Sequence, residues 1–163
     1  MQVNDNLKII RMMPNTPVEV CKGVMAFSCG KNIDESDVKI VEQLFSKLGL
    51  LIEIEESKIN AVSALTGCSP AYIYEIIEAM SDAGVRMGLP REIAIKLSSK
   101  AVEGSGAMVL ETNIHPAVLK DNVTSPAGST IEGIAELENR GLRGIIISAL
   151  YKAYEKTISF AKK

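Results

Sequence analysis

The spacing of hydrophobic positions changes once along the chain. The first part contains three short apolar or alternating runs, at residues 7–13, 24–30 and 50–56, each bounded by proline, glycine or charge. Such runs are typical of β-strands. Between the last two runs, apolar residues recur at helical spacing after Asp34, a good helix cap, and stop before Gly49. The expected order is strand, strand, helix, strand.

After residue 56, the hydrophobic residues recur only at helical spacing. Residues 57–67 can form a short helix, and residues 69–88 open with Ser69 as a candidate cap and Pro70 at the first helical position. This second helix is apolar nearly all round, which predicts burial on more than one side. Pro90 repeats the proline at a first helical position. Four further helices are expected, within residues 89–111, 115–123, 129–141 and 142–163.

Glycines recur inside these expected helices, at Gly84, Gly104, Gly106 and Gly144. Each costs up to about 1 kcal/mol relative to alanine, which is tolerable where two helices approach closely. The apolar helices fit either a monomeric bundle or an interlocked dimer, and we favour the dimer because it hides more apolar surface.

Composition narrows the classes of partner. Of 163 residues, 47% are hydrophobic and only 4% aromatic, so the core is aliphatic, which suits helix packing. A net charge of −2 without a basic block argues against nucleic acid or an anionic membrane as partner. The three cysteines lack metal-ligand spacing, so no metal is expected, and free thiols suit a reducing cytoplasm. No leader or membrane-spanning run is visible, so we expect a cytoplasmic location.

The stretch "TSPAGST" at residues 124–130 is the first candidate for chemistry. Pro126 biases Ser125 towards an extended backbone, and Gly128 permits a positive φ. The helix that follows leaves backbone N–H groups unpaired at its start, so the stretch suits a carboxylate or phosphate.

A simpler interpretation of the same stretch stays open. Ser129 or Thr130 can serve only as the cap of the following helix, with Glu132 as an ordinary acid of its first turn. The residue types alone are compatible with both interpretations.

A second candidate is "RMMPNTP" at residues 11–17, which places Asn15 and Thr16 directly after an expected strand. Ligands of open α/β sheets gather at the carboxyl ends of strands, so both side chains would face such a crevice. A rigid turn with its own hydrogen bonds is the alternative. Cys68 and His115 have no catalytic partner nearby in the sequence, and we expect neither to be catalytic. The chain carries no dinucleotide fingerprint or phosphate-binding P-loop.

Three stretches together resemble the pyrroline-5-carboxylate reductase family. They are "RMMPNTP" at 11–17, "AVSALTGCSPAYIYEIIEAMSDAGVRMGLPRE" at 61–92 and "HPAVLKDNVTSPAGSTIEGIAELENRGLRGIIISAL" at 115–150. The resemblance implies a mainly α chain in which residues 1–56 are the last strands and helix of a Rossmann-like NAD(P)-binding domain. Residues 57–163 are then an all-helical dimerisation and substrate-binding domain.

The resemblance also implies a reaction and its residues. Family members reduce pyrroline-5-carboxylate to L-proline with NADPH or NADH, as homodimers or larger rings. The helix-opening loop of one subunit would complete the site of the other. Thr130 would be catalytic, because its hydroxyl would hold the ring nitrogen. The residues that bind the substrate carboxylate would be Ser125, Gly128, Ser129 and Thr130. The residues that contact the cofactor would be Asn122, Asn15 and Thr16.

The family's N-terminal part, with its glycine-rich cofactor turn, has no counterpart in this sequence. The chain therefore looks like the substrate-binding and dimerisation part of a reductase. The alternative is a catalytically inert dimeric scaffold that binds a small carboxylate. The sequence leaves open the preference between NADH and NADPH and the size of the oligomer.

Overall fold

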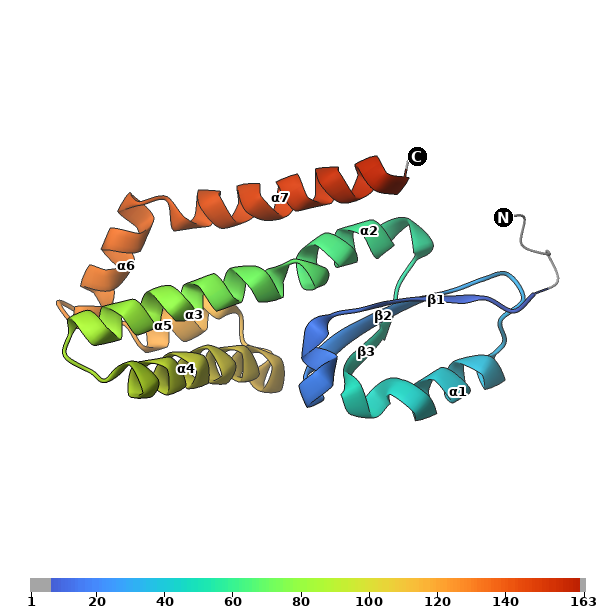
Figure 1. Cartoon of the computed structure of the whole chain (residues 1–163), viewed down its shortest axis with the longest axis horizontal. Coiled ribbons are helices and arrows are strands. Elements are labelled where there is room, and N and C mark those ends of the chain that lie inside the picture. Colours follow the sequence, from blue (N-terminus) through green and yellow to red (C-terminus); the bar gives the residue numbers. More distant parts are fainter. Residues whose placement is uncertain (1–6, 162–163) are drawn as a thin grey trace. The chain divides into compact units, whose positions relative to one another are not determined.

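The computed structural model of the chain describes residues 7–161 (Figure 1). It is mainly α-helical with one small sheet, as predicted. Contacts divide the described residues into two compact units, residues 7–71 with 148–161 and residues 72–147. The division predicted between residues 56 and 57 stays a prediction.

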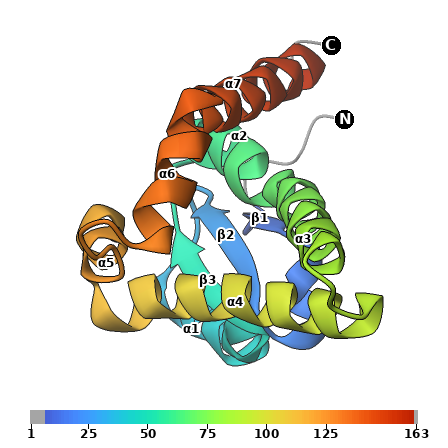
Figure 2. The same cartoon turned by 90° about the vertical axis from the view of Figure 1, so that its left-hand side faces the viewer.

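The sheet has the strand order β1-β2-β3, with β1 and β3 at its two edges (Figure 2). The strands are β1 (Ile10–Pro14), β2 (Gly23–Cys29) and β3 (Gly49–Glu53), which confirms the three predicted strands. β1 is antiparallel to β2, whereas β2 and β3 are parallel, with Gly23 opposite Gly49. The parallel pair is connected through helix α1 (Glu35–Phe45).

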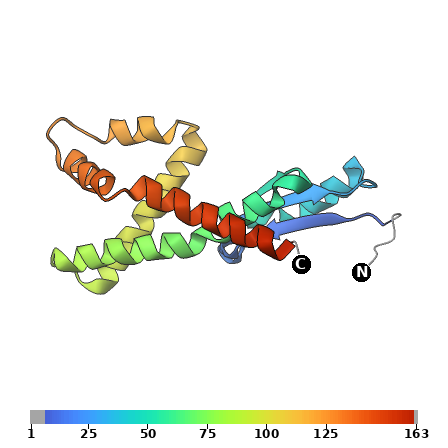
Figure 3. The same cartoon turned by 90° about the horizontal axis from the view of Figure 1, so that it is seen from above.

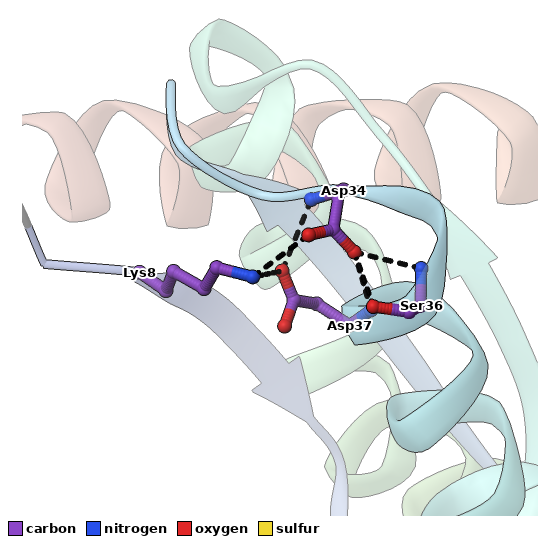
Figure 4. Close-up of polar contacts among 4 residues, drawn as sticks. All are labelled: Lys8, Asp34, Ser36 and Asp37. Atoms are coloured by element: carbon purple, nitrogen blue, oxygen red, sulfur yellow. Dashed lines mark hydrogen bonds and ion pairs between the residues drawn. The ribbon is translucent and has the colours of Figure 1, made fainter.

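The start of α1 is capped as the sequence predicts. The Asp34 carboxylate accepts hydrogen bonds from the backbone N–H groups of Ser36 (2.8 Å) and Asp37 (3.2 Å), and the Asp37 carboxylate accepts from the Asp34 N–H (3.0 Å). Lys8 Nζ lies 2.8 Å from Asp34 Oδ2 and 2.7 Å from Asp37 Oδ2 (Figure 4). Mainly through the Lys8 contact, the pKa of Asp34 is held well below its ordinary value. This cluster fixes the helix start to the chain just before β1.

The core of the first unit centres on β2. Met25, Ala26 and Phe27 are buried on this middle strand, together with Val41 of α1 and Ile59 of α2 (Ile59–Val62). A continuous apolar run is what a strand covered on both faces requires. Residues of α1 and residues of α2 therefore pack against the strands of this sheet.

The helix predicted from Ser69 does not begin with a cap. Helix α2 runs into a π-helical turn, Ser63–Gly67, and α3 (Ser69–Arg86) follows at once. The Ser69 hydroxyl donates to the Leu65 carbonyl, one turn earlier, instead of accepting from a later N–H. The predicted cap is therefore wrong, because the chain is already helical when it reaches Ser69.

The remaining helices confirm the predicted ones. They are α4 (Arg91–Thr112), α5 (Pro116–Asn122), α6 (Ser129–Asn139) and α7 (Leu142–Ala161). Pro90 is the cap residue of α4, one position earlier than predicted. Among residues 7–161, no helix is long and apolar enough to cross a membrane.

Close helix approach occurs at one of the four predicted glycines. A Cβ added at Gly84 would lie 2.9 Å from the Ala94 Cβ, so α3 and α4 meet closely there. A Cβ at Gly104, Gly106 or Gly144 would meet nothing within 4 Å in this chain. The predicted burial of α3 on more than one side is likewise not reached within the single chain, because apolar side chains such as Tyr74 stay exposed.

Candidate functional site

The loop before α6 contains a residue with a positive φ. The positive φ lies at Ala127 (55°), whereas Gly128 has φ −81° and ψ 168°. Gly128 therefore does not use the positive φ that glycine permits. Glycine stands there because a Cβ would overlap the Ser125 hydroxyl and come within 3.2 Å of the Ser125 carbonyl oxygen. The loop needs a bare backbone where Ser125 folds over it.

Gly128, and neither Ser129 nor Thr130, is the cap residue of α6. No side chain caps this helix, so the interpretation of Ser129 or Thr130 as a simple cap is wrong. The Gly128 N–H donates to the Ser125 carbonyl (3.1 Å) and is engaged within the loop. The N–H groups of the first helical turn, beginning with Ser129 and Thr130, are those that an α-helix leaves unpaired.

The side chains at this helix start face solvent. Ser125, Ser129 and Thr130 are exposed, and Gly128 is half-buried (the loop between α5 and α6 is seen in Figure 3). Two exposed residues with adjacent hydroxyls and N–H groups at the positive end of a helix dipole suit an oxygen anion. Glu132 lies in the same first turn, and its charge opposes such an anion. Binding there depends on the direct hydrogen bonds more than on the dipole.

Asn122 ends α5 just before this loop. Thr124 fixes the connection, because its hydroxyl donates to the Lys120 carbonyl (2.6 Å) and its N–H to the Asp121 carbonyl (3.0 Å). Asn122 is exposed at the rim of a hollow of about 390 Å³ between α4 and α5. The hollow is lined mainly by apolar side chains, among them Met108, Val109 and Leu119.

The sequence alone does not predict this hollow, because its lining comes from two helices that are separated by a loop. The only sequence signal is the apolar spacing late in α4, at Met108 and Val109, which continues on α5 at Leu119. Such spacing does not distinguish two helices that pack tightly from two helices that leave a hollow between them.

Asn15 and Thr16 directly follow the carboxyl end of β1. Within the described sheet β1 is antiparallel to β2, so this end lies beside the start of β2, with Pro14 opposite Met25. The predicted place of both residues in a ligand crevice stays a prediction. The Asn15 side chain donates to the Thr66 carbonyl (3.0 Å) and accepts from the Val24 N–H (2.8 Å), whereas Thr16 is exposed.

The other residues with reactive side chains are His115 and the three cysteines. His115 caps α5, since its Nδ1 accepts from the Ala117 N–H (3.2 Å). Cys21, Cys29 and Cys68 are free thiols. Burial, and then the neighbouring Glu53 carboxylate, raise the pKa of Cys29. Within residues 7–161, no cluster of three or more His, Cys, Asp and Glu side chains is arranged to hold a metal ion.

Comparison with known proteins gives consistent sequence matches. A family model described as "Pyrroline-5-carboxylate reductase dimerisation" matches residues 56–159. A pyrroline-5-carboxylate reductase of Glycine max is 44% identical over 152 residues, covering 93% of this chain and 56% of the relative. One of Synechocystis is 43% identical over 155 residues, covering 95% and 58%. The chain thus spans a little over half the length of these curated relatives.

Solved structures match as well. A pyrroline-5-carboxylate reductase of Coxiella burnetii aligns with a TM-score of 0.88 and 35% identity, over 93% of this chain and 57% of that one. The Plasmodium falciparum pyrroline carboxylate reductase, with NADP bound, aligns with a TM-score of 0.85 and 37% identity, over 93% and 61%. On the extent of the family match and these identities, the chain belongs to the pyrroline-5-carboxylate reductase family.

Proposed function

We propose that this chain is the substrate-binding and dimerisation part of an NAD(P)H-dependent reductase that converts pyrroline-5-carboxylate to L-proline. The observation that carries the proposal is the start of α6, where Ser129 and Thr130 are exposed and no side chain caps the helix. We take the reaction from the relatives, which are named pyrroline-5-carboxylate reductases. The free cysteines of the described chain suit a cytoplasmic location.

The substrate carboxylate binds at this helix start. The N–H groups of Ser129 and Thr130 and the hydroxyl of Ser125 donate to its oxygens, and charge-assisted hydrogen bonds of this kind are stronger than neutral ones. Gly128 contributes by its bare backbone, because its own N–H already donates to the Ser125 carbonyl. A planar ring acid held at one end presents its C=N bond in a fixed direction.

Thr130 is the catalytic residue. Hydride adds to the ring carbon of the C=N bond, and the ring nitrogen takes up a proton to become the amine of proline. The Thr130 hydroxyl hydrogen-bonds this nitrogen and helps to deliver the proton. No strong base is required, since positioning accounts for much of the acceleration in such transfers.

NADPH or NADH supplies the hydride when it is bound. The chain has the residue types for the nicotinamide side of such a cofactor, in the exposed carboxamide of Asn122 at the rim of the hollow and in Asn15 and Thr16. It lacks a glycine-rich turn for the pyrophosphate. Cofactor binding therefore requires the further length that the relatives have.

The partner of this chain is a second copy of itself. Apolar side chains on α3, α4 and α7 are exposed in the single chain, among them Tyr74, Leu110 and Ile147. The match to a dimerisation family supports self-association as their cover. Association to a homodimer or a larger ring would also bring the loop of one subunit to the site of the other.

A hybrid protein tests the reaction. The N-terminal part of the Synechocystis relative is joined ahead of this chain, and NAD(P)H oxidation with pyrroline-5-carboxylate is measured. Thr130→Val keeps the side-chain shape but removes the hydroxyl, so turnover should fall about 100-fold. Thr130→Ser keeps the hydroxyl and should retain most of the activity. Equal rates for the two variants would remove Thr130 from the mechanism.

The second candidate function is an inert dimeric scaffold that binds a small carboxylate. The exposed start of α6 favours it, because this helix start can bind a small carboxylate without a cofactor. The folded hybrid separates the two, because a scaffold binds L-proline but does not oxidise NAD(P)H with pyrroline-5-carboxylate even when the cofactor-binding part is supplied. Activity of the chain alone would contradict the scaffold, and a folded but inactive hybrid would contradict the reductase.

A further inference from the structure

Asn15 uses both ends of its carboxamide within the first unit. Its Nδ2 donates to the Thr66 carbonyl (3.0 Å), and its Oδ1 accepts from the Val24 N–H (2.8 Å). Its own backbone N–H donates to the Val24 carbonyl (3.2 Å). The side chain is half-buried. One residue thus joins the end of β1 to the start of β2 and to the π-helical turn Ser63–Gly67.

The π-helical turn is an irregular element that needs outside support. Its wide winding gives fewer regular backbone bonds than an α-helix, and such turns recur at functional sites. Within the turn, the Thr66 hydroxyl donates to the Val62 carbonyl (2.9 Å). Ala64 is buried, so one side of the turn is packed.

β1 supports the turn at a second point. A Cβ added at Gly67 would lie 3.0 Å from Met13 Cε, so the Met13 side chain packs directly against the turn. Met13 and Asn15 are two residues apart, and such residues lie on the same face of an extended chain. One face of the strand end therefore contacts the turn through an apolar side chain and a hydrogen bond.

We propose that Asn15 is a positioning residue, which clamps the π-helical turn Ser63–Gly67 to the end of β1 and so holds its neighbour Thr16 in place on the nicotinamide side. The inference rests on the proposed function for the identity of the ligand and for its place beside Thr16. Asn15 acts through the turn, because both ends of its carboxamide already have protein partners. It is not a group that grips the cofactor with a free side chain.

Amide hydrogen exchange of the 163-residue chain tests the clamp without any assay of activity. Asn15→Asp keeps an oxygen to accept from the Val24 N–H but has no donor for the Thr66 carbonyl at neutral pH. It should accelerate exchange in residues 64–69 by about threefold to tenfold, as expected for one lost hydrogen bond, and leave Val24 unchanged. Asn15→Ala should accelerate both. Glu19→Ala, an exposed change in the same loop, should alter neither by as much as twofold.

Acidification gives a readout that general destabilisation would not produce. The Thr66 carbonyl oxygen favours the protonated form of the carboxyl introduced by Asn15→Asp, because only that form can donate to it, whereas the Val24 N–H favours the ionised form; together they set its pKa. Once protonated, it donates to the Thr66 carbonyl and restores the clamp. Relative to wild type at each pH, protection of residues 64–69 should therefore return below that pKa in Asn15→Asp, but not in Asn15→Ala.

Wild-type exchange of residues 64–69 in a folded Asn15→Asp chain, at neutral pH, would overturn the proposal. So would loss of protection that acid does not restore. In the hybrid enzyme, Asn15→Asp should raise KM for NAD(P)H at least fivefold while kcat changes less than twofold. If the hybrid is inactive, the proposed function fails, and the exchange experiment still decides whether the clamp exists. A changed kcat with unchanged KM would contradict the assigned role.

Discussion

Replacement of Gly49 by alanine is predicted to be among the most damaging single-methyl changes in the sheet. Gly49 begins β3 opposite Gly23, and its backbone has φ 140° and ψ −147°. This conformation is nearly exclusive to glycine. A Cβ there would overlap the Gly23 carbonyl oxygen and lie 2.6 Å from the Gly23 nitrogen. These are backbone atoms, so no side-chain rotation relieves the overlap.

The cost of the backbone conformation and the cost of the steric overlap can be separated with a matched control. The backbone conformation costs about 1–3 kcal/mol for a non-glycine residue. Forcing a methyl into filled space costs about another 1–3 kcal/mol. Gly49→Ala should therefore lower the free energy of unfolding by about 2–6 kcal/mol, a large part of the 5–15 kcal/mol that is typical of domains. Gly88 also has a positive φ (97°) but open space around it, so Gly88→Ala should cost only about 1–2 kcal/mol.

Urea unfolding followed by circular dichroism measures both variants against the wild-type chain. The expected order of stability is wild type, then Gly88→Ala, then Gly49→Ala. A Gly49→Ala chain that is as stable as the Gly88→Ala chain would refute the reasoning, because the contact with Gly23 would then cost nothing.

Two further predictions concern charge and the loop before α6. The Asp34 pKa lies below its unfolded value, so the stabilisation from this carboxylate is present above about pH 4 and is lost as the pH falls below it. Lys8→Met should raise the Asp34 pKa in an NMR titration, and the exposed control Lys31→Met should not; an unchanged pKa in Lys8→Met would rule out the ion pair as the cause. Gly128→Ala should cost about 1 kcal/mol of stability and weaken L-proline binding in calorimetry, because the methyl displaces the serine hydroxyl folded over it. Gly133→Ala, in open space on the same helix, should gain about 0.5–1 kcal/mol and bind normally; equal binding by both would contradict a role for this loop.

Local signals were sufficient for most helices and strands. Asp34 caps α1 as predicted, and the glycine after that helix starts β3. The apolar run at β2 is the buried middle strand. These predictions succeed because capping and burial depend on residues that are close in sequence. Family resemblance, carried by motifs such as the one at 124–130, was needed for everything about the reaction.

Failures occurred where the outcome depends on neighbouring structure. Ser69 has the composition of a cap, but a π-helical turn already precedes it. The direction of β1 was not predicted, although a signal was available: the eight residues between Pro14 and Gly23 are too few for a parallel crossover. The positive φ fell on Ala127 and not on Gly128, since close packing against Ser125 uses the missing Cβ instead.

The outer edge of β3 has a practical consequence for handling this chain. Leu50 and Ile52 on this strand are 52% and 43% exposed, beside backbone groups that pair on one side only within the described sheet. An apolar strand edge of this kind recruits strands of other molecules. Concentrated preparations of the isolated chain should therefore aggregate into β-rich material that binds thioflavin. A charged residue at position 52 should prevent this aggregation.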